Sequence, residues 1–291
     1  MRPIPLFVEL CAGTAAVSLR LHSAEGRPPV ARIGSKLGYA DAILRVMGLL
    51  PGQQAERYLW SDADAGVRML LHGYADADLA SDAAELIRAW SQQDQRDTWK
   101  ELSGQGAFSD SVSSRELARW CWLAVRSWKC DPKFGFKNRA YPPGGSKGGG
   151  YRYRLDAPSQ NLLACQQMNA DIYSCALRVP IPEVASGALV YIDPPYLGTT
   201  GYEHDLSRSV TVGLAIAWAN AGARVFVSEA EPIQELTERG WYSREISWCR
   251  VGSVRNFSTQ QREFLTMSHP GRHPGKPRRN ILVKRRGKVL K

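Results

Sequence analysis

The sequence predicts an α/β fold in which helices cover both faces of a doubly wound, mostly parallel sheet. An apolar run at residues 6–10 passes through a glycine turn into a helix. A second apolar run, at residues 188–192, stops at two prolines, which cannot donate to a sheet ladder. Around these runs, amphipathic segments alternate with short runs of β-forming residues, which is the pattern of βαβ units.

The first 75 residues contain two of these units. A strand at residues 6–10 turns on Gly13 into a helix of small and apolar residues. A second helix is predicted over residues 36–50, where apolar residues recur at helical spacing up to Pro51-Gly52. The stretch "RYLWSDAD" predicts a strand that ends on Ser61 and Asp62, with a helix from about residue 65.

Residues 76–156 have a different character. An amphipathic helix is predicted over residues 114–128, followed by a long loop with five glycines between residues 144 and 150. Loops of this length are usually functional or disordered.

The α/β pattern then returns. It predicts a helix from about residue 159, strands at 171–176 and 188–193, a helix near 210–221, a strand in "ARVFVSE" and two antiparallel strands in "WYSREISWCRV" and "REFLTMS". We therefore expect an α/β domain formed by residues 1–75 and 157–269, an insertion at 76–156 and a basic tail at 270–291.

Composition limits the class of protein. A chain of 291 residues with 44% hydrophobic content can bury a large core, and no apolar run reaches the roughly 18 residues that span a bilayer. The N-terminus lacks the form of a signal peptide, so we expect a soluble, intracellular protein. The six cysteines form no CxxC pair and none lies close to a histidine, so we expect no metal site.

The net charge of +10 is concentrated in two segments. Residues 270–291 hold nine Lys or Arg and no acid, and residues 126–154 hold eight against Asp131 alone. Aromatic residues interleave with the second segment, as contacts to phosphates and bases require. This pattern favours a polyanionic partner, although a solvated tail is an equal alternative for the last 22 residues. The candidate contacts are Arg126, Lys129, Lys133, Lys137, Arg139, Lys147, Arg152 and Arg154.

Asp193 is predicted to lie at the carboxyl end of a core strand, where open α/β sheets bind ligands. The Pro194 carbonyl adds an acceptor and Tyr196 adds a ring face. Together they suit a flat partner with an amino group on its edge, such as a nucleobase. In the alternative interpretation, Pro194 and Pro195 merely end a strand and Tyr196 covers the core.

The segments "FVELCAGTAAVSL", "LWSDAD" and "YIDPPY" resemble the S-adenosylmethionine-dependent DNA adenine-N6 methyltransferases, in particular the Dam-type branch and its phage-encoded relatives. The resemblance covers most of residues 6–267. Some RNA methyltransferases share the DPPY tetrad, but its combination with a glycine turn and an acid after the second strand is more specific. The resemblance implies a Rossmann-like methyltransferase domain, with the insertion at 76–156 recognising DNA.

The resemblance also implies roles for individual residues. The turn that lies against the methionine part of the cofactor would comprise Phe7, Glu9, Cys11, Ala12 and Gly13. Asp62 would accept from the ribose hydroxyls and Asp171 would meet the cofactor adenine, although a surface carboxylate is an equal alternative for Asp171. The target base would be held by Asp193, Pro194, Pro195 and Tyr196.

Two departures from the family pattern concern the cofactor side. Ala15 stands where the family often has a second glycine. The basic, glycine-rich segment that contacts the cofactor precedes the first strand in the family, but its counterpart here, with Lys36, follows it. Lys36 is therefore either a cofactor contact or a plain exposed lysine.

The implied chemistry is direct transfer of a methyl group to an exocyclic amine. Asp193 and the Pro194 carbonyl would accept the amine hydrogens while Tyr196 stacks on a base flipped out of double-stranded DNA. Cytosine-C5 chemistry is excluded because the chain has no Pro-Cys dipeptide. Cytosine-N4, RNA, or a nucleic-acid-binding protein without activity remain alternatives. We expect a monomer in the cytoplasm of a prokaryotic or phage-infected cell, and sequence specificity and a restriction partner stay open.

Overall fold

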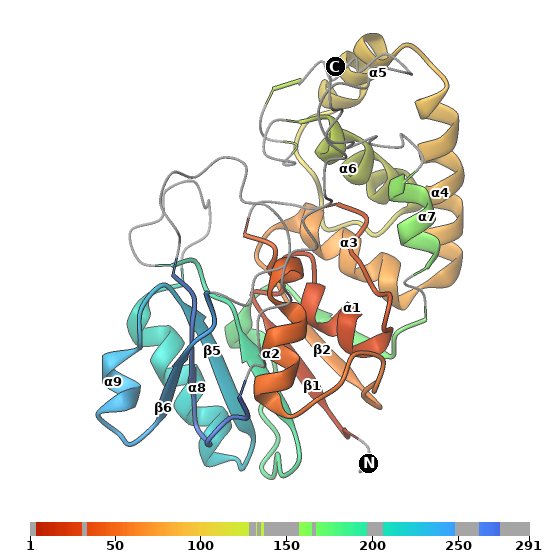
Figure 1. Cartoon of the computed structure of the whole chain (residues 1–291). Coiled ribbons are helices and arrows are strands. Elements are labelled where there is room, and N and C mark those ends of the chain that lie inside the picture. The colour runs from red at the N-terminus through yellow and green to blue at the C-terminus, as the bar shows by residue number, and fades with distance from the viewer. Residues whose placement is uncertain are drawn as a thin grey trace, which may run out of the picture.

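The computed structural model describes residues 4–30, 34–127, 132, 135–136, 157–164, 167–196, 206–247 and 262–273. Within them the chain forms an α/β structure around a mixed, mostly parallel sheet of seven strands, which confirms the predicted class (Figure 1). Most of the basic loop and the tail from residue 274 onward lie outside the described residues. No helix in the described part of the chain is long and apolar enough to cross a membrane.

The sheet has the strand order β3-β2-β1-β4-β5-β7-β6. Strand β7 runs antiparallel to both of its neighbours, and the other neighbouring pairs are parallel. The order reverses between β1 and β4, which makes their carboxyl ends the switch point where such sheets bind ligands. The strands are β1 (Phe7–Leu10), β2 (Tyr58–Ser61), β3 (Ala170–Tyr173), β4 (Leu189–Ile192), β5 (Arg224–Glu229), β6 (Tyr242–Glu245) and β7 (Phe264–Met267).

The parallel strands end at the same level. Leu10 is paired with Ser61 on one side and with Ile192 on the other. Ser61 is paired in turn with Tyr173, and Ile192 with Val227. The segments that follow these residues therefore leave the sheet along one common edge.

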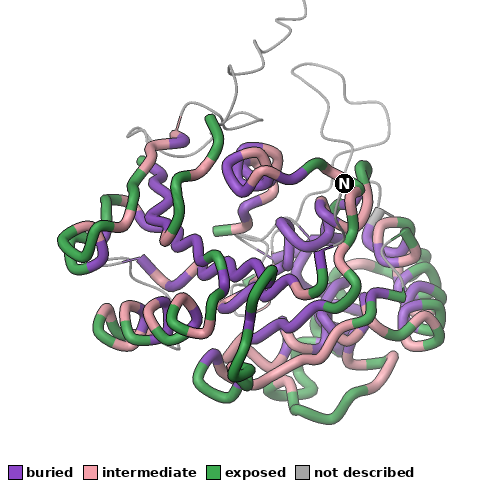
Figure 2. The backbone as a smooth tube through the Cα atoms, turned by 90° about the horizontal axis from the view of Figure 1, so that it is seen from below, coloured by how far each residue is buried: buried purple, intermediate pink, exposed green. Residues whose placement is uncertain are grey.

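Helices cover both faces because the strands alternate their side chains. Phe7 and Tyr58 face a core shared with α1 (Ala16–His22), α2 (Ala40–Met47) and α3 (Ala65–Ala75). Val8 and Leu59 face a second core shared with α8 (Arg208–Asn220) and α9 (Gln234–Thr237). Figure 2 shows the buried backbone in purple through the interior and exposed residues around the rim.

The segment after α3 forms a group of helices beside the sheet (Figure 1). These are α4 (Ala77–Ser91), α5 (Gln95–Ser103), α6 (Ser114–Arg126) and α7 (Ala157–Leu163). Helix α4 packs on α6 and α7, and α3 packs on α6. Their apolar side chains belong to the same core cluster as those of α1, α2 and α3. The helices therefore share one continuous core with one face of the sheet.

One predicted helix is divided, and one predicted strand ends early. The predicted helix over residues 36–50 is divided into a 3₁₀ turn, η1 (Lys36–Gly38), and α2, because Ser35 caps the turn and Tyr39 separates it from the helix. The strand predicted at 171–176 ends at Tyr173, and a second 3₁₀ turn, η3 (Ala176–Arg178), follows it.

Gly66 lies where α3 packs against α6, so replacing it tests how closely these two helices approach. A Cβ atom at this position would lie 2.1 Å from Cδ1 of the buried Trp120 on α6. We predict that Gly66→Ala lowers the free energy of unfolding by about 1–3 kcal/mol, the usual cost of overpacking. Urea denaturation measures it.

Gly213→Ala is the matched control, because a Cβ on this α8 residue has no atom within 4 Å. It should stabilise the protein by about 0.5–1 kcal/mol through helix propensity. Equal midpoints for both variants would show that α3 and α6 are not in close contact.

Candidate active site

The turn after β1 is built from alternating backbone conformations. Cys11, Gly13 and Ala15 have positive φ angles of 56°, 53° and 49°. Hydrogen bonds from Ala12 N to the Ser61 carbonyl (2.8 Å) and from Ala15 N to the Ala12 carbonyl (2.7 Å) hold this conformation. A non-glycine residue in the left-handed region costs about 1–2 kcal/mol. Ala15 thus takes a conformation that a glycine would adopt without strain.

Asp62 connects this turn to the end of β2. Its Oδ2 accepts a hydrogen bond from Gly13 N (2.8 Å), and its Oδ1 accepts one from Asp64 N (2.9 Å). The carboxylate therefore lies directly beside the glycine turn. The structure brings together Ala12, Gly13 and Asp62, as the sequence predicted.

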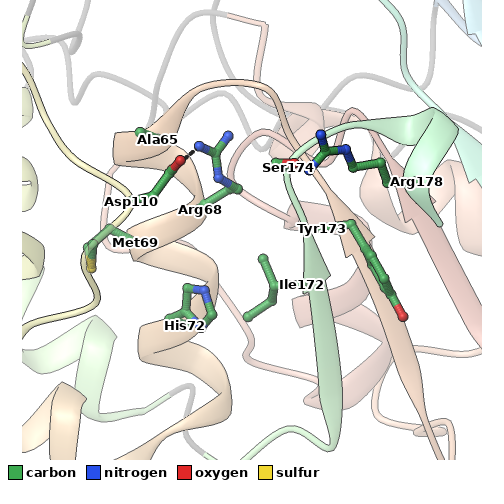
Figure 3. A pocket seen from close by; sticks show the side chains of 9 residues that line it. All are labelled: Ala65, Arg68, Met69, His72, Asp110, Ile172, Tyr173, Ser174 and Arg178. Carbon is green, nitrogen blue, oxygen red and sulfur yellow. Dashed lines mark hydrogen bonds and ion pairs between the residues drawn. The ribbon is translucent and has the colours of Figure 1, made fainter.

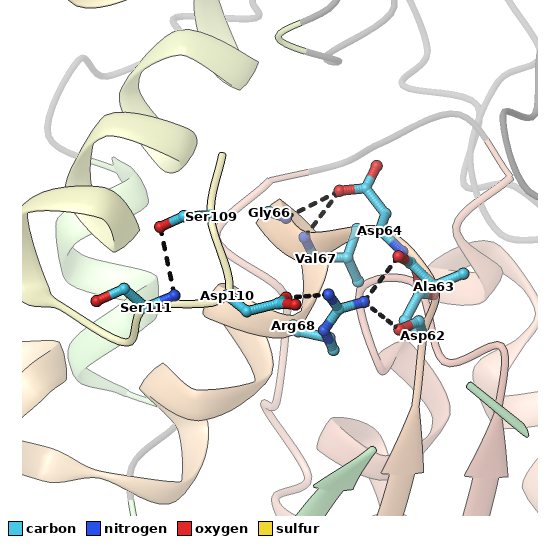
Figure 4. Close-up of polar contacts among 9 residues, drawn as sticks. All are labelled: Asp62, Ala63, Asp64, Gly66, Val67, Arg68, Ser109, Asp110 and Ser111. Atoms are coloured by element: carbon cyan, nitrogen blue, oxygen red, sulfur yellow. Dashed lines mark hydrogen bonds and ion pairs between the residues drawn. The ribbon is translucent and has the colours of Figure 1, made fainter. Parts of the chain in front are cut away.

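Arg68 fixes the loop that carries Asp62 (Figure 4). From α3 its guanidinium donates to the carbonyls of Asp62 (2.8 Å) and Ala63 (2.7 Å) and forms an ion pair with Asp110. Asp110 belongs to the connection between α5 and α6. The loop after β2 is thereby tied to the group of helices.

A cavity of about 330 Å³ lies between α3 and the end of β3 (Figure 3). Arg68, His72, Tyr173 and Arg178 are among the side chains that line it. Burial, with Arg68 adding to it, lowers the pKa of His72 below its usual value. Through Arg68 the cavity adjoins the Asp62 loop.

The carboxyl end of β4 holds a cluster of buried charges around Asp193. Lys36 Nζ lies 2.7 Å from Asp193 Oδ1 and 3.9 Å from Glu263 Oε1. The same ammonium lies 4.7 Å from the centroid of the Tyr196 ring, and the Tyr196 hydroxyl donates to Glu263 Oε1 (2.6 Å). Lys36 is therefore held between a carboxylate and an aromatic face.

Burial and the neighbouring acids shift the pKa values of this cluster. Desolvation raises the pKa of Asp193 to about 6, Lys36 opposes this shift, and Glu263 and Glu229 add to it. Burial also raises the pKa of Tyr196 well above its usual value, so the phenol stays protonated. Asp193 is therefore ionised at neutral pH but close to its titration range.

Cys11 lies between the two halves of the site. Burial raises the pKa of its thiol well above the usual value, and the charges of Asp62 and Asp193 raise it further. Both carboxylates are thus close enough to act on one thiol. Asp193 N donates to the carbonyl of Leu10 (3.1 Å), so the glycine turn, Asp62 and Asp193 lie at the same edge of the sheet.

A comparison of the chain with protein-family models gives no match, and a comparison with curated proteins gives none either. Among the described residues, no group of three or more His, Cys, Asp or Glu side chains is arranged to hold a metal ion.

Several predicted site residues lie elsewhere, and Phe7 and Glu9 need correction. Phe7 is fully buried at the start of β1 against the Tyr58 ring, so it does not reach the edge where the turn lies. Glu9 is also buried, and it accepts hydrogen bonds from the backbone N–H (2.9 Å) and the hydroxyl of Ser18. It therefore satisfies the first turn of α1 rather than facing a ligand.

Asp171 and Arg126 are likewise not placed as predicted. Asp171 is paired with Leu59, two residues before the end of β2, and forms a half-exposed ion pair with Arg57. It does not reach the edge that carries Asp62. Arg126 is 5% exposed, and its guanidinium stacks on Trp122 and donates to Gln95 Oε1 (2.5 Å), so it is not available to a phosphate. The other predicted DNA contacts lie outside the described residues.

Sequence reasoning missed three charged residues of the site. Glu229 ends β5 and Glu263 precedes β7, and both are buried. Arg208, at the start of α8, lies 3.6 Å from Glu229 Oε2. Glu229 ends the predicted strand "ARVFVSE", and a carboxylate at the carboxyl end of a core strand is the signal that identified Asp193. The same signal could therefore have identified Glu229. Glu263 carries no comparable local signal.

Glu9 gives a pH-dependent test of the buried site. Burial raises its pKa from 4.5 to about 7, so between these values the native state binds more protons than the unfolded state. Stability contributed by protonated Glu9 is therefore present below pH 4.5 and lost as the pH rises through 7, an effect of about 3 kcal/mol. We predict that Glu9→Gln removes this loss. The free energy of unfolding of the variant should therefore rise relative to that of the wild type between pH 5 and pH 8.

Urea denaturation at both pH values measures the gain. Glu235→Gln, at an exposed position of α9, is the control and should follow the wild type. A Glu9→Gln curve parallel to the wild-type curve at all pH values would contradict the prediction.

Proposed function

We propose that this chain transfers a methyl group from S-adenosylmethionine to the exocyclic N6 of adenine in DNA. One observation carries the proposal. At the end of β4, a largely buried carboxylate and an aromatic ring hold the ammonium group of Lys36 between them. A carboxylate that accepts N–H groups beside a ring face has the acceptor and the flat surface that the amine of a base needs.

The residues beside β1 and β2 fit the methyl donor. A carboxylate has about four lone-pair positions, so Asp62 can hold backbone N–H groups and also accept from ribose hydroxyls. The cavity lined by Arg68 and Tyr173 adjoins it and leaves room for the rest of a nucleoside. Ala12, Gly13 and Asp62 would hold the donor, and the nearby acids favour its positive charge. When bound, S-adenosylmethionine supplies an electrophilic methyl group on a sulfonium.

The residues after β4 fit the acceptor. The amine of adenine is a weak nucleophile because its lone pair is delocalised into the ring. Asp193 and the Pro194 carbonyl accept its two hydrogens, which directs the lone pair toward the methyl group. As the N–C bond forms and the C–S bond breaks, Asp193 takes up the proton that the amine loses. Tyr196 fixes the plane of the base, so the rate gain comes from positioning and electrostatics.

A duplex base reaches such a site only when flipped out of the stack, at a cost of a few kcal/mol. The basic residues 129–154 support a DNA-recognition role for this segment, with Arg126 excluded by its burial. If these residues contact mainly phosphates, the enzyme discriminates weakly among sequences.

Replacing the acid tests the proposal directly. We predict that Asp193→Asn reduces methyl transfer at least about 100-fold, because the amide cannot take up the proton and donates where an acceptor is needed. Radiolabelled S-adenosylmethionine with duplex DNA, followed by digestion to nucleosides, measures both the rate and the modified base. Asp97→Asn, on the exposed surface of α5, should keep the wild-type rate.

Label in N6-methyladenine is the expected product. Label only in N4-methylcytosine, or only in an RNA substrate, would refute the assignment to adenine in DNA. An undiminished rate in Asp193→Asn would remove Asp193 from the mechanism.

The pH dependence gives a second test. Because the pKa of Asp193 is raised to about 6 in the free protein and its ionised form is the acceptor, kcat/KM for DNA should rise with pH through about 6 and then level off. Values of kcat/KM between pH 5 and pH 9 measure this profile. A rate that stays constant across this range would exclude Asp193 as the titrating base.

A further inference from the structure

We propose that Lys36 occupies the place of the target amine in the free protein and must be displaced before the base can be methylated. This inference rests on the proposed function, since it concerns the same site. It makes Lys36 a residue that regulates access, rather than the cofactor contact or the plain exposed lysine that the sequence suggested.

The contacts of Lys36 coincide with those assigned to the target. Its ammonium lies 2.7 Å from Asp193 Oδ1 and 4.7 Å from the centre of the Tyr196 ring. The side chain is only 8% exposed, so the amine is inside the site and not at its rim. A second nitrogen cannot take the same position, beside Asp193 Oδ1 and over the Tyr196 ring, while this ammonium fills the space.

The segment that carries Lys36 is linked to the glycine turn. Ser35 caps η1 by accepting from Leu37 N (3.4 Å), and its hydroxyl is hydrogen-bonded to the hydroxyl of Thr14 (2.9 Å). Thr14 lies within the turn assigned to the methyl donor. The turn assigned to the methyl donor is therefore in direct contact with the residue next to Lys36.

Displacement of Lys36 also changes the basicity of Asp193. The groups that face Asp193 and influence its titration, or are influenced by it, come from several elements: Lys36, Glu9, Cys11, Tyr191, Tyr196, Glu229 and Glu263. Among those that shift the pKa of Asp193, Lys36 lowers it, whereas burial, Glu263 and Glu229 raise it. When a neutral amine replaces the ammonium, Asp193 becomes a stronger base at the moment when a proton has to be accepted.

The test uses Lys36→Met, which keeps an unbranched side chain as far as Cε and removes the amine. Lys100→Met, at an exposed position of α5, is the control. Carbon-13 NMR of the Asp193 carboxyl should show its pKa rising by about one unit or more in Lys36→Met. At pH 9, where Asp193 is ionised in both proteins, KM for duplex DNA should fall about threefold or more with kcat within about twofold.

The outcomes separate this inference from the proposed function. A wild type that transfers no methyl group refutes the function itself. A wild type that methylates adenine, with KM unchanged or raised in folded Lys36→Met, leaves the function standing and overturns the role of Lys36. An Asp193 titration identical to the wild type also overturns it.

If Lys36→Met does not fold, acetylation of the wild type with acetic anhydride decides the question. Peptide mass spectrometry should show Lys36 reacting several-fold faster when the protein is saturated with adenine-containing duplex and S-adenosylhomocysteine, while Lys100 stays constant. Unchanged reactivity of Lys36 in the saturated complex would overturn the proposal.

Discussion

The candidate site depends on the common level at which the parallel strands end. Leu10, Ser61 and Ile192 are mutually in register although they lie far apart in the sequence. This register brings the glycine turn, Asp62 and Asp193 to one edge of the sheet. A slip of one residue in any strand would turn its alternating side chains to the opposite face and separate the groups. The precision of the site is therefore a property of the sheet rather than of the loops.

Negative charge is concentrated at this edge, where the side chains have little exposure to solvent. Asp193, Glu229 and Glu263 are accompanied by two cations, Lys36 and Arg208. Buried charges persist only where they are paired, and removing one partner is strongly destabilising. The carboxylates are therefore stable only with a cation or an N–H donor beside them. Lys36 and Arg208 are the cations that lie beside them.

The sequence predicted the parts of the fold that depend on local pattern. Alternation and turn residues gave the core strands, and the position of Asp62 and Asp193 after apolar runs gave the acids of the site. Local pattern does not show how far along its strand a residue lies. Phe7 and Asp171 were therefore assigned to an edge that they do not reach. Local pattern also does not show which way a side chain points. Arg126 lies in a basic stretch, but its side chain faces a neighbouring helix. The contacts of Lys36 and Glu263 join segments more than 200 residues apart, and only tertiary structure reveals them.

The continuous core of the helices and the sheet has a mechanical consequence. Side chains such as Trp120, Trp122 and Leu117 belong to the same apolar cluster as Phe7 and Tyr58. Hinging the helices away would bring this surface into water at roughly 25 cal/mol per Å². The two parts consequently behave as one stiff frame. If the chain binds duplex DNA as proposed, the DNA would have to adapt its shape to this frame, and the energy of deformation would be stored in the DNA.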